Sequence, residues 1–287
     1  MNDHPNLAII GGSGLYAMPG LEDVKEQHIS TPFGEPSSPV VTGTMGSRRM
    51  AFLARHGVGH IIPPTKVNYR ANIYALKSLG VRFVLAVSAC GSLREDYAPG
   101  DVVIPNQLFD LTHGRIRTFF DEPGLVAHVG AADPFCNDFG QQAKAAGREA
   151  GATVHWGGTY VTIEGPRFST RAESNAYRSL GFSIIGMTTA PEAFLAKEAE
   201  LCYAVMAHVT DYDVWHEEPV SVDLVVRTLQ KNTQVAQEAV RKLAADLNEH
   251  QECDCETALA NALITDPKSI SKAARKKLGI LIDKYMA

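Results

Sequence analysis

Short apolar runs alternate with helical patterns along most of the chain. Continuous runs such as Phe83–Ser88 are typical of parallel strands that are covered on both faces. The other predicted strands are Leu7–Ile10, Pro39–Met45, Met50–Ala54, Asp101–Pro105, Thr153–Glu164 and Ala204–Val209. Helical periodicity is expected at Asn68–Gly80, Pro134–Glu149, Thr170–Leu180 and from Pro191 to about Cys202. This alternation predicts an α/β fold.

The alternation shows no clean domain boundary. After it, Ser221 is a plausible N-cap for a long amphipathic helix that ends near Asn248. Two short helical patterns follow, at Thr257–Leu263 and Ser269–Tyr285. We therefore expect one domain over residues 1–287, with a carboxyl-terminal helical extension at about 250–287.

Charge and hydropathy narrow the class of partner. The formal net charge is -5, and the first 266 residues contain no block of Lys and Arg, which argues against a nucleic-acid binder. The chain has no stretch of about 18 apolar residues and no basic amino-terminal segment that precedes an apolar run. We expect a cytoplasmic protein that acts on a small molecule and binds neither a membrane nor nucleic acid.

Three predicted strands end in small or cationic residues. These ends are Gly11-Gly12-Ser13-Gly14, Arg55-His56-Gly57 and Ser88-Ala89-Cys90-Gly91-Ser92, and Thr188 and Thr189 follow a fourth run. If the ends converge, their hydroxyls and backbone N–H groups surround a guanidinium and can bind one phosphate. Each of these strand ends, taken alone, can also be explained without a ligand. The alternatives are a tight turn, a structural arginine and a surface histidine. The dinucleotide fingerprint at Gly12–Ala17 is rejected because Met18-Pro19-Gly20 leaves no room for its helix.

Two carboxylates follow the last buried strand. Asp211 and Asp213 are expected just past its carboxyl end, where open α/β sheets bind ligands. A spacing of two along extended chain points both side chains the same way. Such a pair suits the donor edge of a nitrogenous base or the protonation of a leaving group. Together with the anion site, it suggests that phosphate attacks a glycosidic bond whose leaving group is a base.

Seven motifs in unbroken order resemble the 5′-methylthioadenosine phosphorylases, in the trimeric branch of the purine nucleoside phosphorylase family. The resemblance covers about residues 7 to 245 and implies a mixed, twisted central sheet. It also implies phosphorolysis of S-methyl-5′-thioadenosine to adenine and 5-methylthioribose 1-phosphate, with inorganic phosphate as co-substrate and no cofactor, in a homotrimer or a dimer of trimers. The motifs are Ile10–Gly14, Thr31–Gly34, Ala54–Gly57, Ser88–Arg94, Thr162–Ser169, Met187–Glu192 and Thr210–Asp213.

The resemblance also implies a role for each matching residue. Asp211 would protonate the imidazole nitrogen of the purine, and Asp213 would accept from its exocyclic amino group. Ser13 and Ser88 stand where Thr is more common in the family, which keeps the hydroxyl. Phosphate would be held by Ser13, Arg55, His56, Ser88, Ala89 and Thr188. The nucleoside would contact Met187, Phe168, Ser169, Val222, Val226 and His128, the last from a neighbouring subunit.

Other functions remain open at this point. A general purine nucleoside phosphorylase for inosine and guanosine would favour an amide in place of Asp211, because an oxopurine presents an acceptor there. A methylthioinosine phosphorylase is a variant of that alternative. Asp211-x-Asp213 also matches the DxD pair of metal-dependent glycosyltransferases, although a third ligand is missing. A nucleoside-binding protein without activity is the remaining alternative.

The five cysteines form no CxxC pair and lack nearby histidines, so their spacing predicts no metal site. Cys90, Cys136 and Cys202 lie in apolar surroundings and are expected in the core. Cys253 and Cys255 are one residue apart. They can close a small, strained disulfide, or stay as two free thiols in a reducing cytoplasm.

Overall fold

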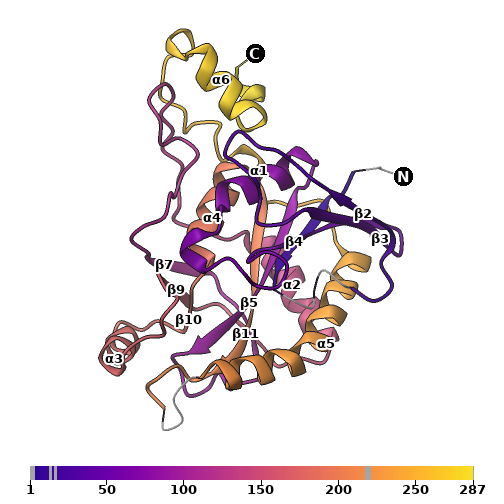
Figure 1. Cartoon of the computed structure of the whole chain (residues 1–287), viewed down its shortest axis with the longest axis vertical. Coiled ribbons are helices and arrows are strands. Elements are labelled where there is room, and N and C mark those ends of the chain that lie inside the picture. The colour runs from indigo at the N-terminus through magenta and orange to yellow at the C-terminus, as the bar shows by residue number, and fades with distance from the viewer. Residues whose placement is uncertain (1–3, 13–14, 16–17, 217–220, 287) are drawn as a thin grey trace.

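The computed structural model describes residues 4–12, 15, 18–216 and 221–286. These residues form one eleven-stranded mixed sheet (Figure 1). Its strands are β1 Leu7–Gly11, β2 Glu22–Gln27, β3 Val40–Met45, β4 Arg48–Ala54, β5 Phe83–Ser92, β6 Val102–Ile104, β7 Gln107–Leu111, β8 Val154–Trp156, β9 Thr159–Ile163, β10 Ile184–Gly186 and β11 Cys202–Asp211. The predicted α/β fold with a mixed central sheet is confirmed.

Strand β5 is the branch point of the sheet. The main path runs β2-β3-β4-β1-β5-β10-β9-β7, and β11 also pairs with β5 and leads to β6 and β8. Strands β4, β1, β5 and β11 are mutually parallel where they pair. Their carboxyl ends therefore meet at one edge, which is where the predicted site residues lie.

Strands β5 and β11 continue beyond the carboxyl ends that the sequence predicts for them. β5 continues to Ser92 because Gly91 and Ser92 pair with β10, so Ser88 and Ala89 lie within a strand and not in a turn. β11 continues to Asp211, which pairs with Gly91 after a register shift. Asp211 is thus the last residue of its strand, and not a residue just past it.

The predicted strand Thr153–Glu164 is two strands. Gly157 and Gly158 both have positive φ, at 87° and 93°, which is accessible to glycine without strain. They turn the chain between β8, which pairs with β6, and β9, which pairs with β7 and β10.

Helices cover both faces of the sheet. Alternate residues of β1 and β11 enter two separate hydrophobic clusters, one with α1 and α4 and the other with α2 and α5. None of the helices in the described ranges is long and apolar enough to cross a membrane. The α-helices are α1 Tyr69–Ser78, α2 Asn137–Glu149, α3 Arg171–Ser179, α4 Thr189–Glu198, α5 Val222–Asp246 and α6 Lys272–Leu278. The 3₁₀ turns are η1 Pro64–Lys66, η2 Cys255–Thr257, η3 Pro267–Ser269, η4 Gly279–Leu281 and η5 Asp283–Tyr285.

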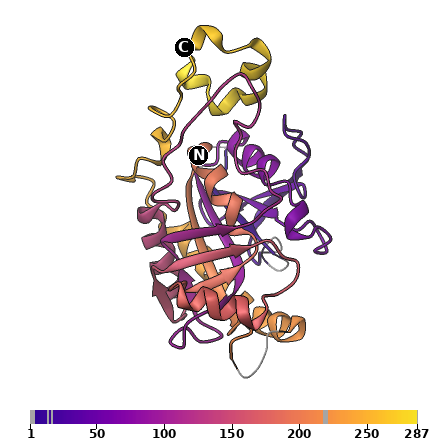
Figure 2. The same ribbon diagram turned by 90° about the vertical axis from the view of Figure 1, so that its left-hand side faces the viewer.

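The carboxyl-terminal extension packs beside the long irregular segment that follows β7 (Figures 1 and 2). Ala127 bridges to Leu263, and Val126 N–H donates to Thr265 Oγ1 at 2.9 Å. Phe119 and Leu125 of the irregular segment are buried in the core. The extension thus fixes a segment that has little secondary structure of its own.

Candidate active site

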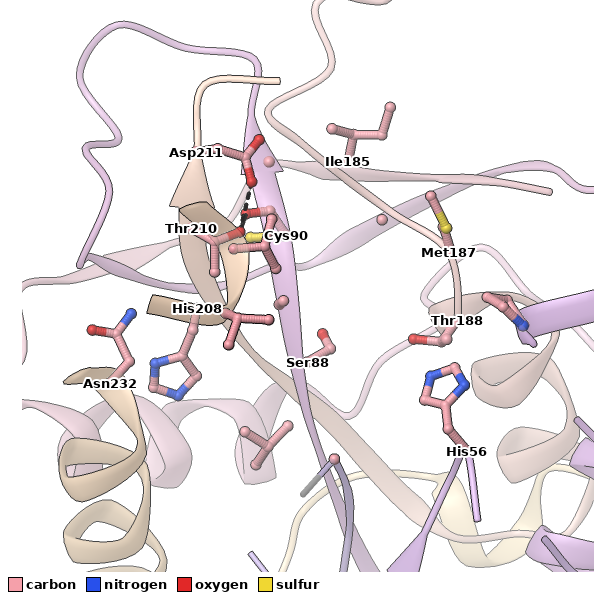
Figure 3. Close-up of a pocket in the computed structure, with 18 of the residues that line it drawn as sticks. His56, Ser88, Cys90, Ile185, Met187, Thr188, His208, Thr210, Asp211 and Asn232 are labelled. Carbon is pink, nitrogen blue, oxygen red and sulfur yellow. Dashed lines mark hydrogen bonds between the residues drawn. The ribbon is translucent and has the colours of Figure 1, made fainter. Parts of the chain in front are cut away.

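One cavity of about 380 Å³ opens at the carboxyl ends of the parallel strands (Figure 3). Residues of β5, β11, the turn after β4 and the start of α4 line it, together with one face of α5. Eleven of the residues predicted from the sequence meet there: Arg55, His56, Ser88, Ala89, Phe168, Ser169, Met187, Thr188, Asp211, Asp213 and Val226. The convergence that spacing alone left open is therefore present.

Arg55 is fixed by a buried ion pair. Its Nε and Nη2 each donate to a carboxylate oxygen of Glu192 at 2.8 Å. Longer contacts of 3.4 Å join Nη1 to Val87 O and Nη2 to Ile10 O. The carboxylate also accepts from Tyr203 Oη at 2.9 Å. The guanidinium thus lines the cavity with its charge already balanced by an acid.

His56 is a neutral imidazole with a defined tautomer. Its Nδ1 lies 2.9 Å from Ile62 O, so Nδ1 carries the hydrogen and donates. Burial, followed by the charge of Arg55, lowers the pKa of His56 to about 4. The His60 ring stacks on it with centroids 4.3 Å apart. Nε2 is consequently an acceptor at neutral pH.

Ser88 and Thr188 supply hydroxyls on the same side of the cavity as His56 (Figure 3). Ser88 Oγ is buried and has no hydrogen-bond partner within the described ranges. Thr188 precedes α4 and makes no side-chain capping bond. Ala190 has non-helical backbone angles, with φ at -98° and ψ at 135°, and its N–H donates to Thr162 Oγ1 at 3.2 Å, so the regular helix begins at Pro191. These groups together suit one phosphate.

Asp211 and Asp213 lie across the cavity from that cluster. Thr210 Oγ1 donates to Asp211 Oδ2 at 2.6 Å, and Asp213 N–H donates to Asp211 Oδ1 at 2.8 Å. Asp213 has a positive φ of 52°, so the chain is not extended as predicted, although both side chains still line the cavity. Burial raises the pKa of Asp211 to about 6 and also raises that of Asp213. Asp211 is therefore suited to donate a proton near neutral pH.

Arg115, from the irregular segment, positions the loop that carries Met187. Its Nη1 donates to Met187 O at 2.7 Å and to Ala190 O at 2.8 Å. Its Nε pairs with Glu164 at 3.1 Å. Because the guanidinium is almost fully buried, Arg115 acts as a structural support for one wall of the cavity and not as a ligand-binding group.

Two predicted residues that the structure describes, Val222 and His128, do not line the cavity, and a third cannot be placed. Ser13 lies outside the described residues. Val222 is 68% exposed at the first position of α5, one helical turn before Val226 and on the same face, and the part of α5 that lines the cavity begins at Val225. His128 is exposed, and its N–H donates to Ala262 O at 2.9 Å.

Other lining residues were missed by sequence reasoning. His208 and Asn232 face each other at the α5 side (Figure 3), and His208 Nδ1 and Nε2 and Asn232 Nδ2 are buried without partners in the described part of the chain. Burial lowers the pKa of His208 to about 4. The sequence does not distinguish these two residues from residues outside a site. His208 is a lone histidine in an apolar strand, and Asn232 is an asparagine in an amphipathic helix.

The chain is similar to proteins of one family over nearly its whole length. A family model described as the phosphorylase superfamily matches residues 6–245. The S-methyl-5′-thioadenosine phosphorylase of Koribacter versatilis is 52% identical over 281 residues, 97% of this chain and 96% of that protein. The protein of the same name from Hyperthermus butylicus is 55% identical over 263 residues, 90% of this chain and 96% of its own.

Solved structures agree with the sequence relatives. A methylthioadenosine phosphorylase from an Antarctic soil metagenomic library superposes with a TM-score of 0.93 at 45% identity, over 97% of this chain and 99% of that one. The methylthioadenosine phosphorylase of Schistosoma mansoni in complex with adenine superposes with a TM-score of 0.83 at 40% identity, over 89% and 96%.

Proposed function

This chain belongs to the phosphorylase superfamily, and on that basis we propose that it cleaves S-methyl-5′-thioadenosine with phosphate to adenine and 5-methylthioribose 1-phosphate. The relatives that are about half identical over almost the full length carry the name of that activity. The observation that carries the proposal is the placement of an anion-binding cluster and a buried carboxyl of raised pKa on opposite sides of one cavity.

Phosphate binds at the cluster formed by Ser88, Ala89, Thr188 and His56, beside Arg55, with Ser13 as a further hydroxyl. The hydroxyls of Ser88 and Thr188 donate to its oxygens. Because His56 Nε2 is an acceptor, it receives the P–OH hydrogen of hydrogen phosphate. The remaining phosphate charge lies under the sugar and stabilises the oxocarbenium-like transition state of ribosyl transfer.

The leaving base is protonated by Asp211. A phosphate oxygen attacks C1′, the bond from C1′ to N9 breaks, and its electron pair passes into the purine. Asp211 in its protonated form gives its proton to N7, which neutralises the departing base. Asp213 accepts from the exocyclic amino group, and its Oδ2 has no partner among the described residues.

The remaining wall residues bind the nucleoside. Met187 lies against the ribose, and Phe168 and Ser169 flank the base. Val226 and, in the assembled protein, Val222 meet the methylthio group together with His128 of a neighbouring subunit. The protein is proposed to be a homotrimer or a dimer of trimers, in which the exposed valines of α5 become covered.

The test is the phosphate dependence of adenine release, followed by absorbance. Purified protein should release adenine from S-methyl-5′-thioadenosine only when phosphate is present, with methylthioribose 1-phosphate as the second product. Equal rates in phosphate-free buffer would indicate a hydrolase and contradict the proposal. Inosine and methylthioinosine as parallel substrates distinguish it from the oxopurine alternatives.

A further inference from the structure

Four of the five cysteines meet at the end of the sheet opposite the catalytic cavity. Their Sγ atoms all lie within 4.8 Å of one another, and Cys202 Sγ is 3.6 Å from Cys253 Sγ. Cys136 is the residue before α2, Cys202 opens β11, and Cys253 and Cys255 come from the carboxyl-terminal extension. The spacing of these residues along the chain predicts no metal site, and only the fold reveals the cluster.

The distances fit a tetrahedral metal site. A zinc ion with four sulfurs at about 2.3 Å places those sulfurs about 3.8 Å apart. A disulfide requires about 2.05 Å. All five cysteines are free in the structure, so the Cys253–Cys255 disulfide allowed by the sequence is not formed. The observed cluster needs only small adjustments to hold an ion at its centre.

The surroundings hold the four sulfurs in place. Cys136 N–H donates to Tyr203 O at 2.8 Å, which ties the start of α2 to β11. Glu252 N–H donates to Asp138 Oδ2 at 3.0 Å, which ties the Cys253 loop to α2. Together these two bonds join the three segments that carry the four sulfurs.

Access and burial also suit a structural ion. Cys136, Cys202 and Cys255 are buried within the cluster on the α2 and α5 side of the sheet, and Cys253 is partly exposed. An ion can therefore enter past Cys253 and is then shielded from water. With four protein ligands no coordination position stays open for a substrate, which is the pattern of structural and not of catalytic zinc sites.

We propose that Cys136, Cys202, Cys253 and Cys255 bind one zinc ion through four thiolates. Binding releases the four thiol protons and leaves a closed site that joins α2, β11 and the carboxyl-terminal extension. The site lies at the first residue of β11, whereas Asp211 is the last. It fixes the extension and takes no part in the reaction.

The first test uses the full-length protein without substitution. The protein is reduced under nitrogen, freed of metal with a chelator, and shown to contain five thiols. Titration with Zn²⁺ against a colorimetric chelator should give one ion per chain and release of four protons, and Co²⁺ should give the spectrum of a tetrahedral thiolate complex. Failure of this reduced, folded protein to bind Zn²⁺ stoichiometrically overturns the proposal.

Two serine variants provide the matched comparison. Cys253→Ser removes the most exposed ligand and should weaken zinc binding by more than about 100-fold, the upper end of what outer-shell changes do. Cys90→Ser removes a buried cysteine outside the cluster and should bind zinc as the parent does. Equal affinity in Cys253→Ser and the parent would place the ion elsewhere. If the protein binds no zinc and peptide mapping finds paired cysteines after air oxidation, the cluster is a disulfide site instead.

Discussion

Arg55 and Glu192 form a two-point ion pair inside the wall of the cavity, with both N–O distances at 2.8 Å and both side chains almost fully buried. The pair joins the turn after β4 to the first turn of α4, residues that are far apart in sequence. It also changes the expected contribution of Arg55, because phosphate meets a guanidinium whose charge is already balanced.

Glu192→Gln should separate the contribution of the ion pair to stability from its influence on phosphate binding. Removing one charge of a buried pair leaves the other uncompensated and lowers the free energy of unfolding by about 3–5 kcal/mol. The freed guanidinium should at the same time attract phosphate more strongly, so the KM for phosphate should fall. Urea unfolding and phosphate saturation curves measure the two quantities.

Asp96→Asn, which breaks the exposed Arg94–Asp96 pair, is the control and should change stability by less than about 1 kcal/mol. A higher phosphate KM in Glu192→Gln would mean that the pair itself forms the anion site.

Asp211→Asn should alter the choice of base. A carboxyl at this position accepts from or donates to an aminopurine, whereas an oxopurine places its carbonyl lone pairs there. Sites built on hydrogen bonds reject such mismatches by factors of up to roughly 10⁴. The variant should lose most activity on methylthioadenosine and improve the ratio of kcat/KM for methylthioinosine over methylthioadenosine. An unchanged ratio with both activities reduced would reassign base selection to Asp213.

The pH profile should report the protonation of Asp211. Its folded pKa is raised to about 6, and the proton donor is the form present below that value. Hence kcat/KM for the nucleoside should decline as pH rises above about 6. The hydroxyl of Thr210 donates to this carboxylate and lowers its pKa. Thr210→Val should therefore move the decline to higher pH by about one unit, since a hydrogen bond to a charged group is worth about 1.5 kcal/mol. A profile that does not move in this variant would show that another group controls it.

His128→Ala should weaken binding of the methylthio substrate without unfolding the chain. His128 is exposed and is not among the described residues that line the cavity, so we expect its effect on affinity to come from a neighbouring subunit. The nucleoside KM should rise while the phosphate KM and the melting temperature stay as in the parent. Sedimentation at assay concentration should give a trimer or hexamer. An active monomer would refute the shared site.

Local signals in the sequence were sufficient for much of the fold. The helices predicted to start at Asn68 and Thr170 are present as α1 and α3, and each begins one residue later with that residue as its N-cap. The carboxylates and the phosphate-binding residues were each predicted at strand ends, and the parallel pairing of β4, β1, β5 and β11 brings those ends to one sheet edge. The proposed roles of the individual site residues stay predictions.

Long-range partners could not be predicted in the same way. Glu192 stands near the start of a predicted helix, and nothing near it in sequence indicates that Arg55 lies opposite. Arg115 lies in a segment without a predicted element, and most of its contacts are with backbone carbonyls, which a sequence does not reveal. The extension of β5 depends on β10, a three-residue strand formed much later in the chain. The cysteine cluster likewise exists only after three separate segments have docked.

Strand β11 is buried at all ten positions and is paired with β5 along almost its entire length. Amide hydrogens in such a strand exchange with solvent only when the whole domain opens. Asp211 is therefore mounted on the part of the molecule that opens least, and its carboxylate holds its place from one turnover to the next. In a deuterium-exchange experiment β11 should remain protected with or without ligand. Substitutions in the α5 side chains that line the cavity can therefore change which 5′ group of the nucleoside is accepted. Such substitutions reshape the cavity without moving Asp211.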